Sequence, residues 1–361
     1  MWGVDIDPEH PFVYSIFGVQ YTQETPTELQ QTRIDTFHSL INPAALYIDN
    51  IVQDDPSSGT KTRIWLAYWK NLSTYKTWWE GKDVVEFWSA LPADAGMWRE
   101  TMVISRGRTQ SGLAAPKSEG MAYIGKVIPR TTAEGYWGCY RDRYEENSKT
   151  NRMDSSLGSP PEPRQTTDSK EIRSGRVLMT KFPENLCFVV EGQDHSSISD
   201  EEKAHWFENF DTSVTNWIND LANAEPAAGI LDTRLCYAPE NGTYRHSTPE
   251  ALNYNRKIQL FYFLDHGYME RIGVRNKGHV ALRNNFLASY CPAGAMGKIA
   301  KLMLWVETSV VKSDEIECEY VGCLEGTGLM KFDHLEAFKG TSDAPASKWL
   351  SSLKGWIPFS S

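Results

Sequence analysis

The sequence predicts an α+β protein built from two related halves, and three observations support this fold class. Short apolar runs of strand length alternate with helical stretches along the chain. Two segments, residues 64–88 and 259–283, resemble each other, and a polar stretch at residues 145–175 lies between them. Duplicated α+β units whose sheets pack against each other are the natural outcome.

The order strand, helix, strand is clearest in the second half of the chain. Residues 185–190 (NLCFVV) and 233–238 (TRLCYA) are apolar runs of strand length. Between them, Ser199 and Glu202 match the capping box of a helix N-terminus. Apolar residues then recur at spacings of 4, 4, 3 and 4, which predicts one amphipathic helix through Trp206, Phe210, Val214, Trp217 and Leu221.

The two similar segments each run from an aromatic strand through a polar turn into a helix. In this alignment Tyr68 corresponds to Tyr262, and with a two-residue gap Asp83 corresponds to His279. The repeat is weak, so chance similarity is the alternative. If the repeat is real, each half is one copy of the same α+β unit.

The stretch at residues 145–175 is rich in Ser, Pro, Thr and charged residues and lacks hydrophobic periodicity. It predicts a long, exposed and flexible loop. We expect it to divide the chain into an N-terminal half, residues 1–144, and a C-terminal half, residues 176–361. Such a loop either separates two halves or projects over a site.

Composition and charge narrow the class of protein. Apolar residues make up 40% of the 361 residues and charged residues 23%, as in ordinary globular proteins. The net charge of -10 argues against nucleic acid as a partner. No stretch resembles a signal peptide or a membrane span, so we expect a cytoplasmic protein without a membrane partner. Six scattered cysteines without CxxC spacing suggest neither a disulfide framework nor a zinc site.

Aromatic residues are unusually frequent, at 12% of the chain with 13 tryptophans. Flat apolar side chains suit a flat ligand. The alternative is that they fill a large core.

His279 is the histidine that the pattern singles out. Leu282, Phe286 and Tyr290 follow it at spacings of 3, 4 and 4, which places all four on one face of a helix. A histidine that leads an apolar face can reach a buried ligand, and neutral imidazole is a common axial ligand of haem iron. A hydrogen-bonded core histidine is the alternative. The other seven histidines form no HxH or HExxH pattern.

Several segments together resemble the haem-containing aldoxime dehydratase family, in the order in which that family carries them. They are residues 17–21 (FGVQY), 135–143 (GYWGCYRDR), 185–194 (NLCFVVEGQD), the His279 segment and 319–329 (EYVGCLEGTGL). The resemblance implies two ferredoxin-like α+β halves that form a haem-binding domain of the dimeric α/β-barrel type. It implies haem b, ferrous when active, with His279 as the iron ligand and Leu282 and Phe286 beside the cofactor. It is compatible with a homodimer.

Members of that family dehydrate an aldoxime to a nitrile, with a distal set of Arg, Ser and His. Carried over position by position, the arginine falls on Val190, the serine on Ala238 and the histidine on Leu324. All three are hydrocarbon side chains. The resemblance therefore implies a dry distal pocket that lacks the family's proton donors, and loss of a general acid typically costs about two to four orders of magnitude in rate.

Two carboxylates are candidates for the missing proton donor. Glu325 lies in the same turn as Leu324, and Glu134 comes just before the GYWGC motif. Glu191 is not an obvious substitute, because strand alternation turns it away from the face that holds Val190. For Glu325, a solvated turn carboxylate is the alternative.

Three functions follow from these observations. The first is a haem lyase that acts on the N–O bond of an aldoxime-like, N-hydroxylated small molecule bound to iron through nitrogen. The second is a haem enzyme of changed reaction type, such as a rearrangement or N–C or N–N bond formation. The third is a haem binder without catalysis. An apolar distal wall suits all three.

Overall fold

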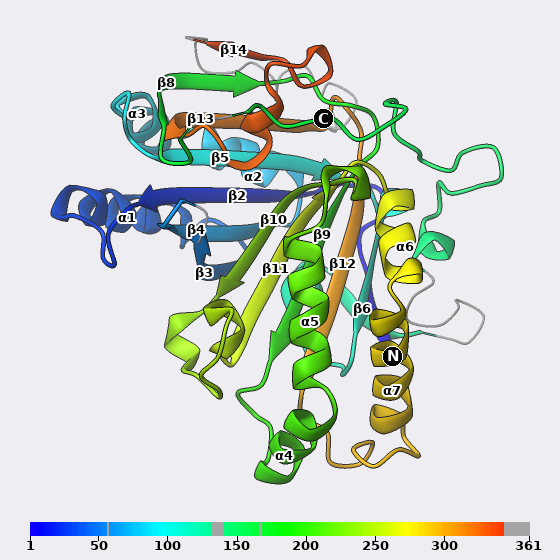
Figure 1. Ribbon diagram of the computed structural model, residues 1–361. Coiled ribbons are helices and arrows are strands. Elements are labelled where there is room, and N and C mark those ends of the chain that lie inside the picture. Colours follow the sequence, from blue (N-terminus) through cyan, green and yellow to red (C-terminus); the bar gives the residue numbers. More distant parts are fainter. Residues whose placement is uncertain (56–57, 131–139, 166–167, 343–361) are drawn as a thin grey trace.

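The computed structural model describes residues 1–55, 58–130, 140–165 and 168–342. All strand pairings among these residues are antiparallel, and they connect fourteen strands into one continuous sheet. The sheet folds into two groups of strands whose inner faces enclose the main core (Figure 1). Among the described residues, no helix is long and apolar enough to cross a membrane.

The first strand group lies at the top of Figure 1 and carries three helices on its outer face, α1 (Glu28–Ile41), α2 (Leu72–Trp79) and α3 (Lys82–Ser89). Its strands follow one another in the order β14 (Gly340–Ser342), β8 (Ile172–Met179), β13 (Ile316–Leu324), β5 (Met97–Ile104), β2 (Phe12–Tyr21), β4 (Thr60–Trp69) and β3 (Tyr47–Asp55).

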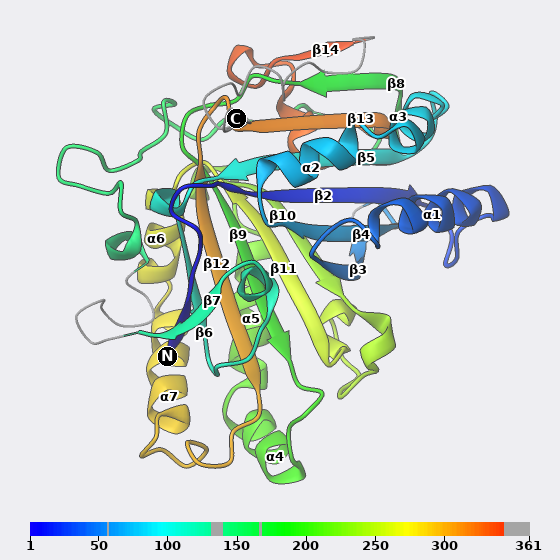
Figure 2. The same cartoon turned by 180° about the vertical axis from the view of Figure 1, so that it is seen from behind.

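The second strand group continues from β3 and is covered by α4 (Asp200–Asn209), α5 (Asp211–Ala222), α6 (His266–Arg275) and α7 (Lys277–Tyr290). Figure 2, seen from behind, shows the helices of the first group in front and those of the second at the back. The strands run in the order β10 (Ile230–Tyr237), β11 (Arg256–Phe263), β9 (Leu186–Asp194), β12 (Met303–Val311), β6 (Thr109–Leu113), β1 (Trp2–Asp5) and β7 (Lys126–Pro129).

The central strands of the two groups follow the same path. Along the chain, the central part of each group reads strand, helical segment, strand, strand, helical segment, strand, where a helical segment is one or two helices. Its four central strands lie in the spatial order fourth, first, third, second. The repeat aligned in the sequence coincides with this equivalence, since Tyr68 lies on β4 and Tyr262 on β11. The predicted strands at residues 185–190 and 233–238 are β9 and β10.

Two glycines occupy equivalent positions on the inner faces. Gly18 lies against the indole of Trp98, and Gly192 lies against that of Trp305. A guanidinium covers each of these indoles, with its central carbon 4.5 Å from the Trp98 ring centroid and 4.7 Å from that of Trp305. Each indole therefore fills the space that a side chain on the neighbouring strand would need.

Two buried glutamates connect the strand groups through hydrogen bonds. Glu307 on β12 accepts hydrogen bonds from tyrosine hydroxyls of the first group. Glu100 on β5 accepts them from a tyrosine of the second group and from one on β13. Burial raises the pKa of Glu307 to about 7. The donors and their oxygen–oxygen distances are Tyr14 (2.6 Å) and Tyr68 (3.2 Å) for Glu307, and Tyr262 (3.0 Å) and Tyr320 (2.8 Å) for Glu100.

The expected division of the chain at residues 1–144 and 176–361 does not coincide with the division in space. Strands β1, β6 and β7 come from the N-terminal half but extend the second group, while β8, β13 and β14 come from the C-terminal half and extend the first. The halves interlock because each supplies edge strands to the other.

The helix predicted from Ser199 to Leu221 is two helices. Ser199 accepts the backbone N–H of Glu202, as the capping box requires, but the Glu202 carboxylate accepts from the backbone of Lys301 and Leu302 instead of closing the box. The chain breaks at Phe210, whose φ of -130° ends α4, and α5 begins at Asp211. The periodicity continues across the break, so spacing alone could not reveal it.

The described residues of the stretch at 145–175 contain no helix, as expected, but the stretch is attached to the fold. Met153 is buried and packs against Val310. The backbone N–H of Ser155 donates to Asp265, and that of Arg164 donates to a carbonyl at 2.8 Å. These contacts attach the stretch at a few points, and β8 already begins at Ile172.

Gly192→Ala should destabilise the fold by about 1–3 kcal/mol, because overpacking forces side chains and backbone to shift. A Cβ at this position would lie 2.0 Å from the Trp305 indole. The matched control is Gly158→Ala, where no atom lies within 4 Å of the new Cβ. Denaturant unfolding measures both variants, and equal unfolding free energies for the two would contradict the packing argument.

Candidate functional site

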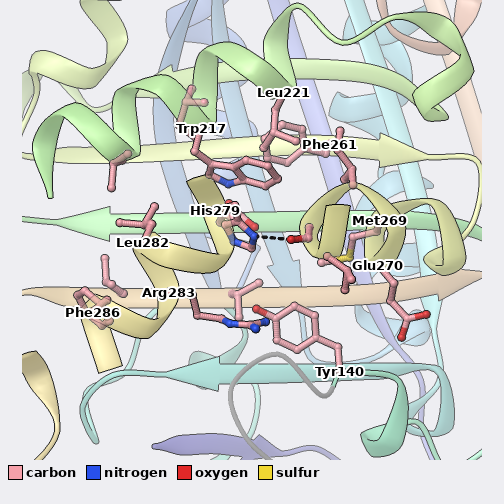
Figure 3. Close-up of a pocket in the computed structure, with 18 of the residues that line it drawn as sticks. Tyr140, Trp217, Leu221, Phe261, Met269, Glu270, His279, Leu282, Arg283 and Phe286 are labelled. Carbon is pink, nitrogen blue, oxygen red and sulfur yellow. Dashed lines mark hydrogen bonds between the residues drawn. The ribbon is translucent and has the colours of Figure 1, made fainter. Parts of the chain in front are cut away.

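A cavity of about 580 Å³ lies between the outer face of the second strand group and helices α5, α6 and α7 (Figure 3). Its volume is within the range of sites that hold small molecules and cofactors. The lining is largely apolar and includes Ile218, Leu221, Phe261, Phe263, Leu304 and Val306. The helices form one wall of the cavity and strands β9, β11 and β12 form the other.

His279 lies on the helix wall, as the sequence predicts. Asn276 caps α7 by accepting the backbone N–H of His279 at 2.8 Å. The Nδ1 of His279 lies 2.9 Å from the carbonyl oxygen of Gly273, and its ring stacks on Trp217 with 4.1 Å between centroids. A carbonyl can only accept, so Nδ1 carries the proton and Nε2 has a free lone pair. Burial lowers the pKa of His279, which favours the neutral imidazole that binds metals.

Leu282 and Phe286 also line the cavity, one and two turns after His279. No residue of α7 is fully buried, although Leu282 and Phe286 also pack against the cluster that contains Phe210. Their partly exposed apolar side chains are suited to contact a bound ligand.

Glu191 lies on the sheet wall, because successive side chains along β9 point to opposite faces of the sheet. Val189 packs with the helices and Val190 packs in the core between the strand groups, so Glu191 and Val189 share the outward face. The structure records no hydrogen bond or ion pair for the Glu191 carboxylate among the described residues. Burial alone raises the pKa of Glu191 to about 7.

Glu270 is a second carboxylate at the cavity, and its environment is the opposite. Its Oε2 accepts from Arg141 at 2.9 Å, and its Oε1 lies 3.6 Å from Nδ1 of His266. Although burial acts in the other direction, these partners lower the pKa of Glu270 to about 2. Glu270 therefore stays charged, whereas Glu191 exchanges a proton near neutral pH.

Val190, Ala238 and Leu324 do not line this cavity, in contrast to the assignment from the resemblance. Val190 and Ala238 are buried in the core between the strand groups. Leu324 ends β13 in the first strand group, where its backbone N–H donates to Gln20. On β9, the side chain that faces the helices is that of Glu191.

Of the two predicted proton donors, the structure describes only Glu325. Glu325 does not line it, and its carboxylate lies 3.9 Å from the guanidinium groups of Arg164 and Arg173. Glu134 lies outside the described residues. The carboxylate that the described part of the sheet presents to the cavity is Glu191, which the alternation along β9 places opposite to Val190.

Trp217 is a second residue at the site whose role the sequence did not reveal. It was predicted only as one position of an apolar helix face, and it stacks on the His279 ring. Nothing in the spacing distinguishes it from Val214 or Leu221. The contact depends on how α5 and α7 lie beside each other.

Comparison with known proteins agrees with this geometry. The model of a family of haem-containing dehydratases matches residues 15–329. The chain belongs to this haem-containing dehydratase family. It is 24% identical over 283 residues to phenylacetaldoxime dehydratase of Bacillus sp. (strain OxB-1), covering 76% of this chain and 75% of that protein. It is also 24% identical over 341 residues to aliphatic aldoxime dehydratase of Rhodococcus erythropolis, covering 92% and 90%.

A solved structure shows that the fold is shared. A crystal structure of an aldoxime dehydratase in complex with butyraldoxime superposes with a TM-score of 0.73 at 19% identity and covers 92% of this chain and 88% of that one. A second aldoxime dehydratase structure gives a TM-score of 0.70. The mixed α/β architecture with a large antiparallel sheet is therefore that of the aldoxime dehydratases.

The residues at the cavity fit the haem of this dehydratase family. A lone imidazole suits an iron whose equatorial ligands come from a porphyrin, and a hydrogen bond from Nδ1–H to a carbonyl is the usual way such a ring is oriented. Among the described residues, no group of three His, Cys, Asp or Glu side chains could hold a bare metal ion. The apolar walls and the volume suit a flat hydrophobic cofactor.

Glu191→Gln should stabilise the haem-free protein at alkaline pH. Folding raises the pKa of Glu191 to about 7, above the value of about 4.3 in an unfolded chain, so the folded state binds the proton more tightly. The contribution of this group to stability then falls as pH rises from about 4.3 to about 7. We expect the variant to gain about 1–3 kcal/mol at about pH 8 and much less at about pH 5.

Denaturant unfolding at the two pH values measures this effect, with Glu208→Gln as the matched exposed control. The same gain at both pH values would show that Glu191 is not titrating between them.

Proposed function

We propose that this dehydratase binds haem b through His279 and converts aldoximes into nitriles. The observation that carries the proposal is the His279 imidazole, which points its free Nε2 from a helix wall while Gly273 and Trp217 fix the ring. The named activities of the phenylacetaldoxime and aliphatic aldoxime dehydratases support the substrate class.

The side chains at the cavity have separable roles in this proposal. Leu282 and Phe286 pack against the cofactor and exclude water on the helix side, and Phe261 and Val306 do so on the sheet side. Arg283 lies at the cavity with its guanidinium beside Tyr140 in Figure 3, where positive charge suits the carboxylates of a haem. Dehydration needs such a dry site, because water competes for the polar groups of the substrate.

When bound, haem supplies the iron to which the oxime nitrogen attaches, together with electron density that weakens the N–O bond. The protein must then provide a proton for the departing hydroxyl and a base for the hydrogen on carbon. Neither Glu325 nor any of the three apolar positions Val190, Ala238 and Leu324 lines the described cavity. The proton must therefore come from another group.

We also infer that the two strand groups are ferredoxin-like halves. Their shared strand and helix order, and the shared spatial order of their central strands, support this inference. The site lies on one half only, because the helices of the first group pack closely on their strands. The proposed duplication therefore separates a half that binds cofactor from a half that supports it.

His279→Ala should remove most of the bound haem and at least about two orders of magnitude of aldoxime turnover, because the axial bond is the directional anchor of the iron. The measurements are haem content by absorbance and nitrile formation from a small aldoxime under reducing, anaerobic conditions. Added imidazole should partly restore the spectrum in His279→Gly. The matched control is His334→Ala, an exposed histidine far along the chain. A His279→Ala protein with full haem content and an unchanged spectrum would rule out this ligand.

A further inference from the structure

Glu191 lies on the sheet wall, across the cavity from the helix wall that carries His279. Among the described lining residues it is the only carboxylate on the sheet side. A haem held by His279 would occupy the space between the two walls. The carboxyl group of Glu191 would then face the cofactor and its substrate from the wall opposite to His279.

The surroundings of Glu191 leave it free to act on a ligand. Its cross-strand neighbours are Val306 on β12 and Gln259 on β11. Gln259 is almost completely buried, and neither its side-chain oxygen nor its side-chain nitrogen has a hydrogen-bond partner. Directly opposed residues on antiparallel strands lie on the same face about 4.5–5.5 Å apart at Cβ. The Gln259 amide is therefore an unused polar group beside the carboxyl, able to orient it.

The equivalent residue of the first strand group shows that the fold does not need an acid at this position. Gly18 and Gly192 are equivalent because each lies against a tryptophan of the neighbouring strand, so Phe17 is the counterpart of Glu191. Phe17 is fully buried among aromatic rings of α2 and α3. Where one half places a phenyl ring for packing, the other places a carboxyl group towards a cavity.

We propose that Glu191 is the proton-transfer residue of this site. The inference rests on the proposed function. The carboxyl proton of Glu191 passes to the oxime oxygen, and the N–O bond breaks with its electron pair leaving on oxygen as water. The resulting carboxylate takes the hydrogen from the oxime carbon as a proton, and the C–H electron pair becomes the third C–N bond. The sum is R–CH=N–OH to R–C≡N and water, and Glu191 ends protonated as it began.

The pH dependence follows from the protonated form being the active one. Because burial raises the pKa of Glu191 to about 7, the rate constant kcat/KM should fall as pH rises above about 7. Besides His279, the charged or titratable side chains that face the same cavity from α6, α7 and the loop before β8 are Tyr140, Arg141, Asp142, Arg152, Glu270 and Arg283. Of these, Glu270 is held ionised by its partners, so it does not compete as the acid.

The first test is the pH profile of nitrile formation by haem-loaded parent and Glu191→Gln. The variant keeps the size of the side chain but cannot transfer a proton. We expect kcat/KM at about pH 6 to fall by about two to four orders of magnitude, and the alkaline limb near pH 7 to disappear. Glu208→Gln, an exposed glutamate on α4, should behave as the parent. Equal rates and equal pH profiles for parent and Glu191→Gln would overturn the proposal.

The second test does not depend on turnover. Carbon monoxide bound to the reduced holoprotein reports a nearby hydrogen-bond donor through its C–O stretching frequency in the infrared spectrum. In the parent we expect this band to shift with pH around the pKa of Glu191, and in Glu191→Gln we expect no shift. A band that stays constant in the parent from about pH 5 to about pH 9 overturns the proposal even if the variant fails to fold or to bind haem.

The two tests separate this proposal from the proposed function. A haem-loaded parent that converts no aldoxime, yet shows the pH-dependent band that Glu191→Gln removes, contradicts aldoxime dehydration and supports the position of Glu191 as a proton donor. An active parent whose band and pH profile are unaffected by Glu191→Gln supports dehydration and contradicts Glu191. In that case, another group supplies the proton.

Discussion

The two-residue period of strand β9 determines what the cavity contains on its sheet side. Phe188 and Val190 point into the core between the strand groups, so Val189 and Glu191 must point towards the helices. Gly192 pairs with Trp305, whose indole occupies the space in front of it. A slip of one residue would place a side chain against that indole and exchange the two faces. Packing on the inner face therefore fixes the chemistry on the outer face.

The equivalent strand groups use their outer faces differently. On the first group, helices α1 to α3 pack closely, and Trp65, Trp69, Trp78 and Trp88 fill the space between helices and strands. On the second group, α5 to α7 leave a cavity, and His279 lies on its wall. The high tryptophan content thus serves mainly to fill a core. From the sequence alone, filling a core was the alternative to contact with a flat ligand. The outer face of the first group is closely packed, whereas that of the second keeps a cavity.

The sequence was a good guide wherever the information is local. Helix periodicity located α7 and placed His279 on its apolar face, and the weak repeat paired Tyr68 with Tyr262. The exchange of edge strands such as β6 and β13 depends on contacts between distant parts of the chain, and no local pattern records it. Which residues form the sheet wall of the cavity also depends on distant contacts. Alternation shows that Val190 and Glu191 face opposite ways, but only the packed structure shows which face meets the cavity.

The buried glutamates Glu100, Glu191 and Glu307 are of two kinds, those that accept hydrogen bonds from tyrosine hydroxyls and one that has no such partner. Glu307 and Glu100 accept hydrogen bonds from tyrosine hydroxyls of the opposite strand group, so they stabilise the contact between the groups. Glu191 has no such partner, and an unpaired carboxyl group on an apolar wall lowers the stability of the fold at neutral pH and above. The counterpart position in the first group holds Phe17, which packs without this cost. A group that weakens the fold, lies in a cavity and exchanges its proton near neutral pH has the properties expected of a functional acid rather than a structural one.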